Sequence, residues 1–176
     1  MRHAVSVRQV LVDQFDLVWA LTELHLAALS EDDFPWPPSD LVWTVRQDAD
    51  GAWRPDWADV EPDPIPVPTV AWLTWQMLWY WTTALARLQQ RNPPDRHDVT
   101  WPGTGMAAIA ELRDLSTRWR TALVALDDGD LARPSAFPWP ADAGRTVADM
   151  VAWLNVELAK NAAEIGQIRM IRATKT

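Results

Sequence analysis

The chain has 176 residues, a net charge of −8 and no cysteine. A chain of this length suits one domain that buries roughly two-thirds of its unfolded surface. Without cysteine there is no disulfide framework, no thiolate nucleophile and no cysteine-type zinc site. The acidic balance argues against nucleic acid as a partner, because nucleic-acid binding needs a basic surface.

No segment has the pattern of a signal peptide or of a membrane span. The N-terminal residues 1–16 contain no adequate apolar run. The most apolar segment, residues 70–86, is near the lower length limit of a span, and its tryptophans are spread along it rather than gathered at its ends. We therefore expect a buried helix there, no membrane partner and a cytoplasmic location.

Prolines divide the chain into stretches of helical length. All fourteen lie within residues 35–68, 93–102 and 134–140, and a proline inside a helix costs about 3 kcal/mol. The first proline-free stretch predicts a helix from about Val5 to Leu29. Its apolar stripe is predicted to contain Val7, Val10, Leu11, Val18, Leu21 and Leu24.

A long polar and aromatic insert, residues 30–68, follows this helix. Two β-patterned runs, 41–45 and 52–53, flank the turn-forming residues 48–51, which predicts a small β-hairpin. Loops of this length in compact domains tend to be functional. The insert is therefore expected to be a lid or an interface.

Three further helices are predicted, each between a residue that can open it and a signal that ends it. They run from Thr69 to about Gln90, from about Thr104 to about Asp127 with Gly129 as a stop, and from Thr146 to about Arg172. The predicted fold class is all-α: a four-helix bundle with one long crossover and a small β-hairpin insert between the first two helices. Residues 1–176 are expected to form it as one domain.

Aromatic side chains and one amide share a face of the second helix. Trp72, Trp75, Gln76 and Trp79 are spaced i, i+3, i+4 and i+7, and Tyr80 is adjacent. A buried amide needs hydrogen-bond partners, because an unsatisfied one costs about 1–3 kcal/mol. Gln76 is therefore either a partly exposed residue beside a tryptophan-rich core or a polar group inside a pocket.

Five polar residues interrupt the otherwise apolar fourth helix: Asn155, Glu157, Lys160, Asn161 and Glu164. One interpretation is a solvated face with ordinary helix pairs, each worth about 0.2–0.5 kcal/mol. Apolar neighbours such as Trp153 leave no clean polar face, however. Glu157 and Asn161, four residues apart, are therefore predicted to be buried or to line a pocket.

Three segments of the chain fit one family pattern. Residues 69–76 read T-V-A-W-L-T-W-Q, close to T-(V/I)-x-W-x-x-W-H, and residues 43–57 fit a W-x-V…DG-x-W…DW hairpin. Residues 153–169 are close to a last helix of the form N-x-E-x-x-H-H-x-x-E-I. In these patterns the chain resembles the DinB-like superfamily. The resemblance implies a four-helix bundle with a pocket that holds a metal ion.

At the metal-ligand positions that the resemblance implies, this chain has other residues. Those positions correspond to Gln76, Glu157 and Asn161, and Lys160 stands where a further histidine would fall. Zinc and nickel favour imidazole, thiolate or carboxylate ligands, whereas glutamine and asparagine supply neutral carbonyl oxygens. The three histidines of the chain share no ligand spacing. We therefore predict no zinc, nickel or other metal at this site.

Three functions fit the sequence. In the first, an enzyme of specialised metabolism isomerises or cyclises an apolar small molecule without a metal, through the catalytic residues Glu157, Gln76 and Asn161. The walls of its pocket would be Trp72, Trp75, Trp79, Tyr80, Trp153, Asn155 and Lys160. In the second, implied by the resemblance, the chain is a mycothiol-type S-transferase that uses a low-molecular-weight thiol. In the third it is a non-catalytic ligand carrier or homodimeric interaction module, because tryptophan is enriched in cores and interfaces alike.

Overall fold

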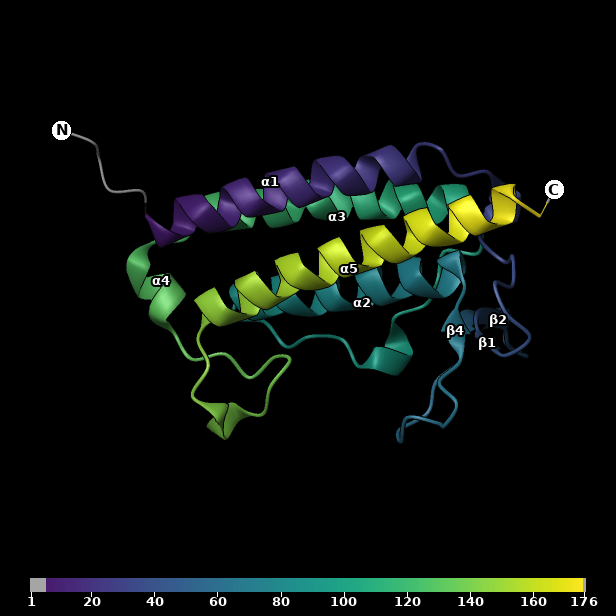
Figure 1. Cartoon of the computed structure of the whole chain (residues 1–176). Helices are drawn as coiled ribbons and strands as arrows, with labels where there is room; N and C mark the ends of the chain where they lie inside the picture. The colour runs from purple at the N-terminus through teal and green to yellow at the C-terminus, as the bar shows by residue number, and fades with distance from the viewer. Residues whose placement is uncertain (1–5, 176) are drawn as a thin grey trace.

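The computed structural model describes residues 6–175. Four long helices lie side by side as a bundle, and two lobes project from one face of it (Figure 1). No helix in this range is both long and apolar enough to cross a membrane. The helices are α1 Val7–Leu26, α2 Val70–Leu88, α3 Gly105–Ala125, the short α4 Asp128–Ala132 and α5 Val147–Ala173.

The helices run in two directions. α1 and α5 run one way and α2 and α3 the other (Figure 1). Two consecutive parallel helices need a return segment, and residues 89–104, which include the 3₁₀-helix Arg96–Asp98, run back along the bundle from α2 to α3. This arrangement packs α2 against both α3 and α5 and packs α1 mainly against α5. The predicted all-α bundle with a small β insert is confirmed.

Side-chain caps begin the helices where the sequence predicts them. The Thr69 hydroxyl accepts a hydrogen bond from the backbone of Trp72 at 3.3 Å, and Thr146 forms a capping box with Asp149. Both predicted caps are confirmed. The predicted stop at Gly129 is wrong, because α3 ends at Ala125 and Gly129 lies within α4.

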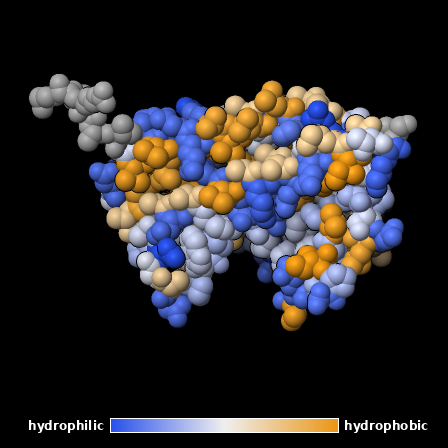
Figure 2. Space-filling view, in the orientation of Figure 1, coloured by the Kyte–Doolittle hydropathy of each residue, from blue (hydrophilic) through white to orange (hydrophobic). Residues whose placement is uncertain are grey.

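The predicted apolar stripe of the first helix is largely wrong. Leu11 and Val18 are buried, but Val7, Val10, Leu21 and Leu24 are exposed. The buried face of α1 contains Leu11, Val12, Phe15, Val18, Thr22 and Leu26. Two faces of α1 are apolar, so periodicity alone cannot select the one that packs on the bundle. Figure 2 shows apolar atoms gathered over the outer surface of this helix. Val5, where this helix was predicted to begin, lies outside the described residues.

The insert contains two separate strand pairs. β2 Val45–Gln47 and β3 Trp53–Pro55 are antiparallel, which confirms the hairpin around residues 48–51. The start of the predicted strand belongs elsewhere, since β1 Val42–Trp43 pairs in parallel with β4 Val67–Pro68. Thr44 separates β1 from β2, and its backbone N–H donates a hydrogen bond to the Asp56 carboxylate at 3.0 Å.

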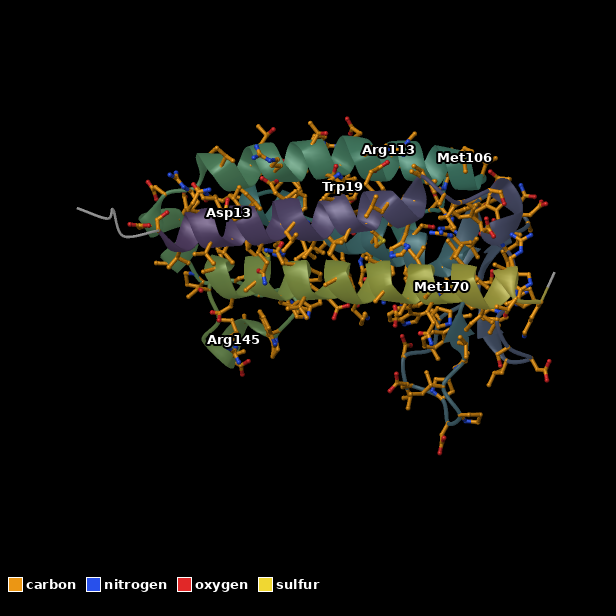
Figure 3. The ribbon with its side chains drawn as sticks, turned by 45° about the horizontal axis from the view of Figure 1, so that its top comes forward. Asp13, Trp19, Met106, Arg113, Arg145 and Met170 are labelled. Carbon is orange, nitrogen blue, oxygen red and sulfur yellow. The ribbon has the colours of Figure 1, made fainter. Side chains whose placement is uncertain are left out.

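Ion pairs between α1 and α3 lie on the surface. Arg120 is 2.7 Å from Asp16, and Arg113, labelled in Figure 3, pairs with Glu23. Exposed pairs of this kind each contribute at most about 1 kcal/mol. The buried apolar side chains, rather than these charges, hold α1 on the bundle.

Candidate functional site

A buried pair of amide side chains joins α2 to α5. Gln76 and Asn161 are 7 % and 1 % exposed, and Asn161 Nδ2 donates to Gln76 Oε1 at 2.9 Å. Asn161 Oδ1 has no hydrogen-bond partner among the described residues. Two residues 85 positions apart in the chain therefore meet at the seam between α2 and α5.

Charged side chains of α5 lie beside this amide pair. Glu157 Oε2 is 2.8 Å from Lys160 Nζ. Glu164 follows Lys160 by one helical turn, and one of its carboxylate oxygens is buried without a hydrogen-bond partner within residues 6–175. Burial raises the pKa of Glu164, an effect that Lys160 opposes and Glu157 reinforces. Lys160 therefore sits between two carboxylates in different environments.

Tyr80 extends the polar cluster on α2. It lies one turn after Gln76, and its hydroxyl oxygen is 3.5 Å from Gln76 Nε2. Burial, reinforced by the charge of Glu157, raises the pKa of Tyr80 to about 12. The phenol therefore stays protonated at neutral pH and is available as a hydrogen-bond donor.

The space beside Glu157 and Asn161 at the seam is very small. Its volume is about 10 Å³, which is room for one water molecule at most. A ligand larger than water therefore does not fit in this space. The space is lined by Met77, Tyr80, Trp81, Leu154, Glu157, Leu158 and Asn161.

Aromatic rings from α2, α5 and the two lobes pack together around Tyr80 and Trp79. Tyr80 contacts Trp79 and Trp153, with ring centroids 4.8 and 5.1 Å apart. Phe137, from the lobe of residues 134–146, packs on Tyr80 at 6.0 Å and on Trp153 at 5.4 Å. Trp57, from the insert, packs on Trp79 at 5.5 Å. We call these five residues the aromatic groove; Figure 2 shows the surface hollowed between the two lobes that supply Phe137 and Trp57.

Trp72 and Trp75 anchor loops to α2 beneath the aromatic groove. The indole of Trp72 donates to the backbone oxygen of Asp56 in the insert at 2.8 Å. The indole of Trp75 donates to the backbone oxygen of Val99 in the return segment at 2.6 Å. Both side chains are buried. Their rings lie directly behind the aromatic groove: Trp75 stacks on Trp79 with ring centroids 5.6 Å apart, and Trp57 packs on Trp75 at 6.1 Å and on Trp72 at 6.5 Å.

Asn155 lies away from the seam and faces α1. Its Nδ2 donates to the Leu11 backbone and to Gln14 Oε1 of α1, both at 3.0 Å. Asn155 precedes Glu157 by two residues, which places the two on opposite sides of a helix with 3.6 residues per turn. The other residues predicted for the site (Gln76, Trp79, Tyr80, Trp153, Glu157, Lys160 and Asn161) do gather along the α2/α5 seam.

Sequence reasoning missed several residues of the site. Glu164 is spaced i+7 from Glu157, and that spacing could have placed it on the same face of α5. Phe137 belongs to the second of two F-P-W-P sequences, at 34–37 and 137–140, but nothing local indicates that it reaches Tyr80. The sequence pattern of residues 43–57 includes Trp57 but does not assign it to the site, and Trp81 was not assigned to it either. Their places depend on contacts between distant segments.

The donor set at the seam does not suit a divalent transition metal. Gln76, Glu157 and Asn161 offer one carboxylate and two neutral amides, whereas zinc and nickel prefer imidazole, thiolate and carboxylate. The two amides are hydrogen-bonded to each other, and the carboxylate faces an ammonium group. In the part of the chain that the structure describes, no group of three His, Cys, Asp or Glu side chains is placed to share a metal ion.

The sequence of the chain matches one known protein family. Residues 14–165 match the DinB superfamily, a segment that includes the insert, all of α2 and α5 as far as Ile165. Searches of curated proteins and of solved structures gave no match. The chain belongs to the DinB superfamily.

Proposed function

We propose that the protein binds a planar, mostly apolar small molecule in the aromatic groove and acts on it without a metal ion. The observation that carries this proposal is the amide pair. Gln76 and Asn161 stand at the ligand positions that the sequence resemblance implies, yet they are hydrogen-bonded to each other and lie next to an ammonium–carboxylate pair. That set can form hydrogen bonds and move protons, but it is poorly suited to holding a metal.

The groove suggests the shape of the ligand. Trp79, Tyr80 and Trp153 are only partly buried, so each leaves some ring surface to a ligand. Flat apolar molecules gain from such surfaces, because aromatic contacts contribute about 0.5–1.5 kcal/mol beyond area burial. Glu157 and Lys160 lie on α5 one and two turns after Trp153. A ligand with a planar body and one polar group, such as a carbonyl, fits both features.

Two side chains can carry the chemistry. The Glu157 carboxylate accepts a proton from the carbon next to the ligand's carbonyl, and Tyr80 donates a hydrogen bond to the carbonyl oxygen as charge develops there. Glu157 then returns the proton to a different carbon. The product is an isomer of the substrate, so the step needs no oxidant, reductant or second substrate.

Binding is tested with a planar probe, 2-naphthol, titrated into the full chain by calorimetry. Trp153→Ala removes one ring of the groove and should weaken binding by about tenfold. Trp36→Ala is the matched control: Trp36 is also partly buried, but it packs beside Lys175 and outside the groove. Equal affinities for the wild type and Trp153→Ala would contradict the proposal.

Metal analysis separates this proposal from thiol S-transferase chemistry. Protein offered zinc and nickel should retain neither, because the seam lacks suitable ligands. About one retained equivalent that is lost in Glu157→Ala would overturn the metal-independent proposal and favour the thiol S-transferase. Glu157→Gln distinguishes an enzyme from a carrier, since it should still bind ligand but should no longer exchange a ligand proton with solvent.

A further inference from the structure

A second and larger pocket lies near the C-terminal end of α2. Its volume is about 420 Å³, within the range of small-molecule sites. Three arginines line it, and no aspartate or glutamate does. This local positive charge contrasts with the net charge of −8 of the chain. The lining residues include Arg87, Gln90, Arg91, Asn92, Arg133 and Ser135.

The end of α2 places two of these arginines. Gln90 has a left-handed backbone, with φ of 54°. The Arg91 N–H donates to Ala86 O at 2.8 Å and the Gln90 N–H donates to Arg87 O at 3.0 Å. These bonds form a Schellman motif, which ends the helix and folds the chain back. As a result Arg91 lines the same pocket as Arg87, although it lies beyond the helix.

The third arginine is held by the backbone. Arg133 donates from Nη2 to Leu88 O and from Nε to Asp130 O, each at 3.4 Å, and its Nε also lies 3.4 Å from the Asp130 carboxylate. Its own backbone oxygen accepts a hydrogen bond from Val147 at the start of α5. Arg133 is therefore fixed in place before any ligand arrives, whereas Arg87 and Arg91 are exposed, with Arg91 donating to the side-chain oxygen of Gln89.

A simpler account covers only part of this cluster. Basic side chains near a helix C-terminus interact favourably with the helix dipole, by about 0.3–1 kcal/mol each. That account suits Arg133, which donates to a terminal carbonyl of α2. It does not explain Arg87, whose guanidinium has no ion-pair or hydrogen-bond partner among the described residues, or why the three surround an open pocket.

We propose that the pocket lined by Arg87, Arg91 and Arg133 binds a small anionic molecule through its phosphate or carboxylate groups. The planar guanidinium fork matches both groups and binds them bidentately. This site goes beyond the function proposed for the aromatic groove. Ser135 lines the arginine pocket and Phe137, two residues later, packs in the groove, so the same lobe borders both sites.

The test uses calorimetric titration of the full chain at low salt with pyrophosphate and, separately, with citrate. Saturable binding to one site is expected, and Arg87→Gln and Arg91→Gln should each weaken it by about tenfold. Both side chains are exposed, and among the described residues that of Arg91 donates only to the side chain of Gln89, so both variants should fold. Arg118→Gln is the matched control, because Arg118 is an exposed arginine of α3 paired with Asp114.

Each outcome has a defined meaning. Tighter binding of pyrophosphate assigns the site to phosphate esters, and tighter binding of citrate assigns it to polycarboxylates; either supports the proposal. Absence of saturable binding to both probes at millimolar concentration would overturn it. An equal loss of affinity in Arg118→Gln would also overturn it, since the attraction would then be a diffuse charge effect.

Discussion

Replacing the two members of the buried amide pair one at a time should destabilise the protein unequally. In Gln76→Leu, Asn161 Nδ2 loses its acceptor. Asn161 Oδ1 already lacks a partner within residues 6–175, so the whole buried amide of Asn161 becomes unpaired. In Asn161→Leu, Gln76 Oε1 loses its donor, but the unpaired Oδ1 is removed with the side chain. The double variant leaves neither amide.

The magnitudes follow from burial. An unpaired buried polar group costs about 1–3 kcal/mol, and Gln76 and Asn161 are almost fully buried. Gln76→Leu should therefore lower the free energy of unfolding by about 2–3 kcal/mol. Asn161→Leu exchanges one unpaired oxygen for another and should cost less than about 1 kcal/mol. The double variant should lie within about 1 kcal/mol of the wild type, because replacing both partners by apolar groups is nearly neutral.

Urea unfolding at neutral pH measures these differences. Equal losses of stability in the two single variants, or a double variant that loses their sum, would contradict the unequal pairing of the two amides. Thr83→Val provides a control on the same helix. The Thr83 hydroxyl is buried without a hydrogen-bond partner among the described residues, so its removal should leave stability unchanged or raise it.

Two further predictions concern α1 and Glu164. Leu24→Gln, on the exposed face of α1, should change the free energy of unfolding by less than about 0.5 kcal/mol. Phe15→Ala, on the buried face, should lower it by about 3–5 kcal/mol. Urea unfolding measures both values, and the reverse order would contradict the packing described for α1. Because burial raises the pKa of Glu164 above its ordinary 4.5, the folded state binds this proton more tightly than the unfolded state does. The wild type therefore loses stability as the pH rises from that ordinary value through the folded-state pKa. Glu164→Gln should therefore be more stable than the wild type at neutral pH, and thermal unfolding should show this difference shrinking toward zero in acid. A stability difference that does not change with pH would contradict the raised pKa of Glu164.

Helix positions were predictable because their signals are local. Proline excludes helix within a few residues, and Thr69 and Thr146 cap helices through bonds to residues only three positions away. The departure from histidine at Gln76 and Asn161 was equally visible, because a resemblance in short motifs needs no tertiary contact. The end of α3 near Asp127 was predicted to within two residues of Ala125, but Gly129 was wrong as its stop, because the capping box of Asp127 and Asp130 begins α4 there.

The sequence by itself therefore determined the helical class, the helix starts and the chemistry of the residues at the seam. Only the tertiary structure decided which apolar face of α1 is buried, that Asn155 bonds to α1 while Asn161 bonds to Gln76, and that Phe137 reaches Tyr80. The arginine pocket also needed the fold, because it joins the end of α2 to residues 133–136. The physical reason is shared: each of these outcomes depends on packing between segments far apart in the chain, and a helical period marks apolar faces without naming the partner that covers them.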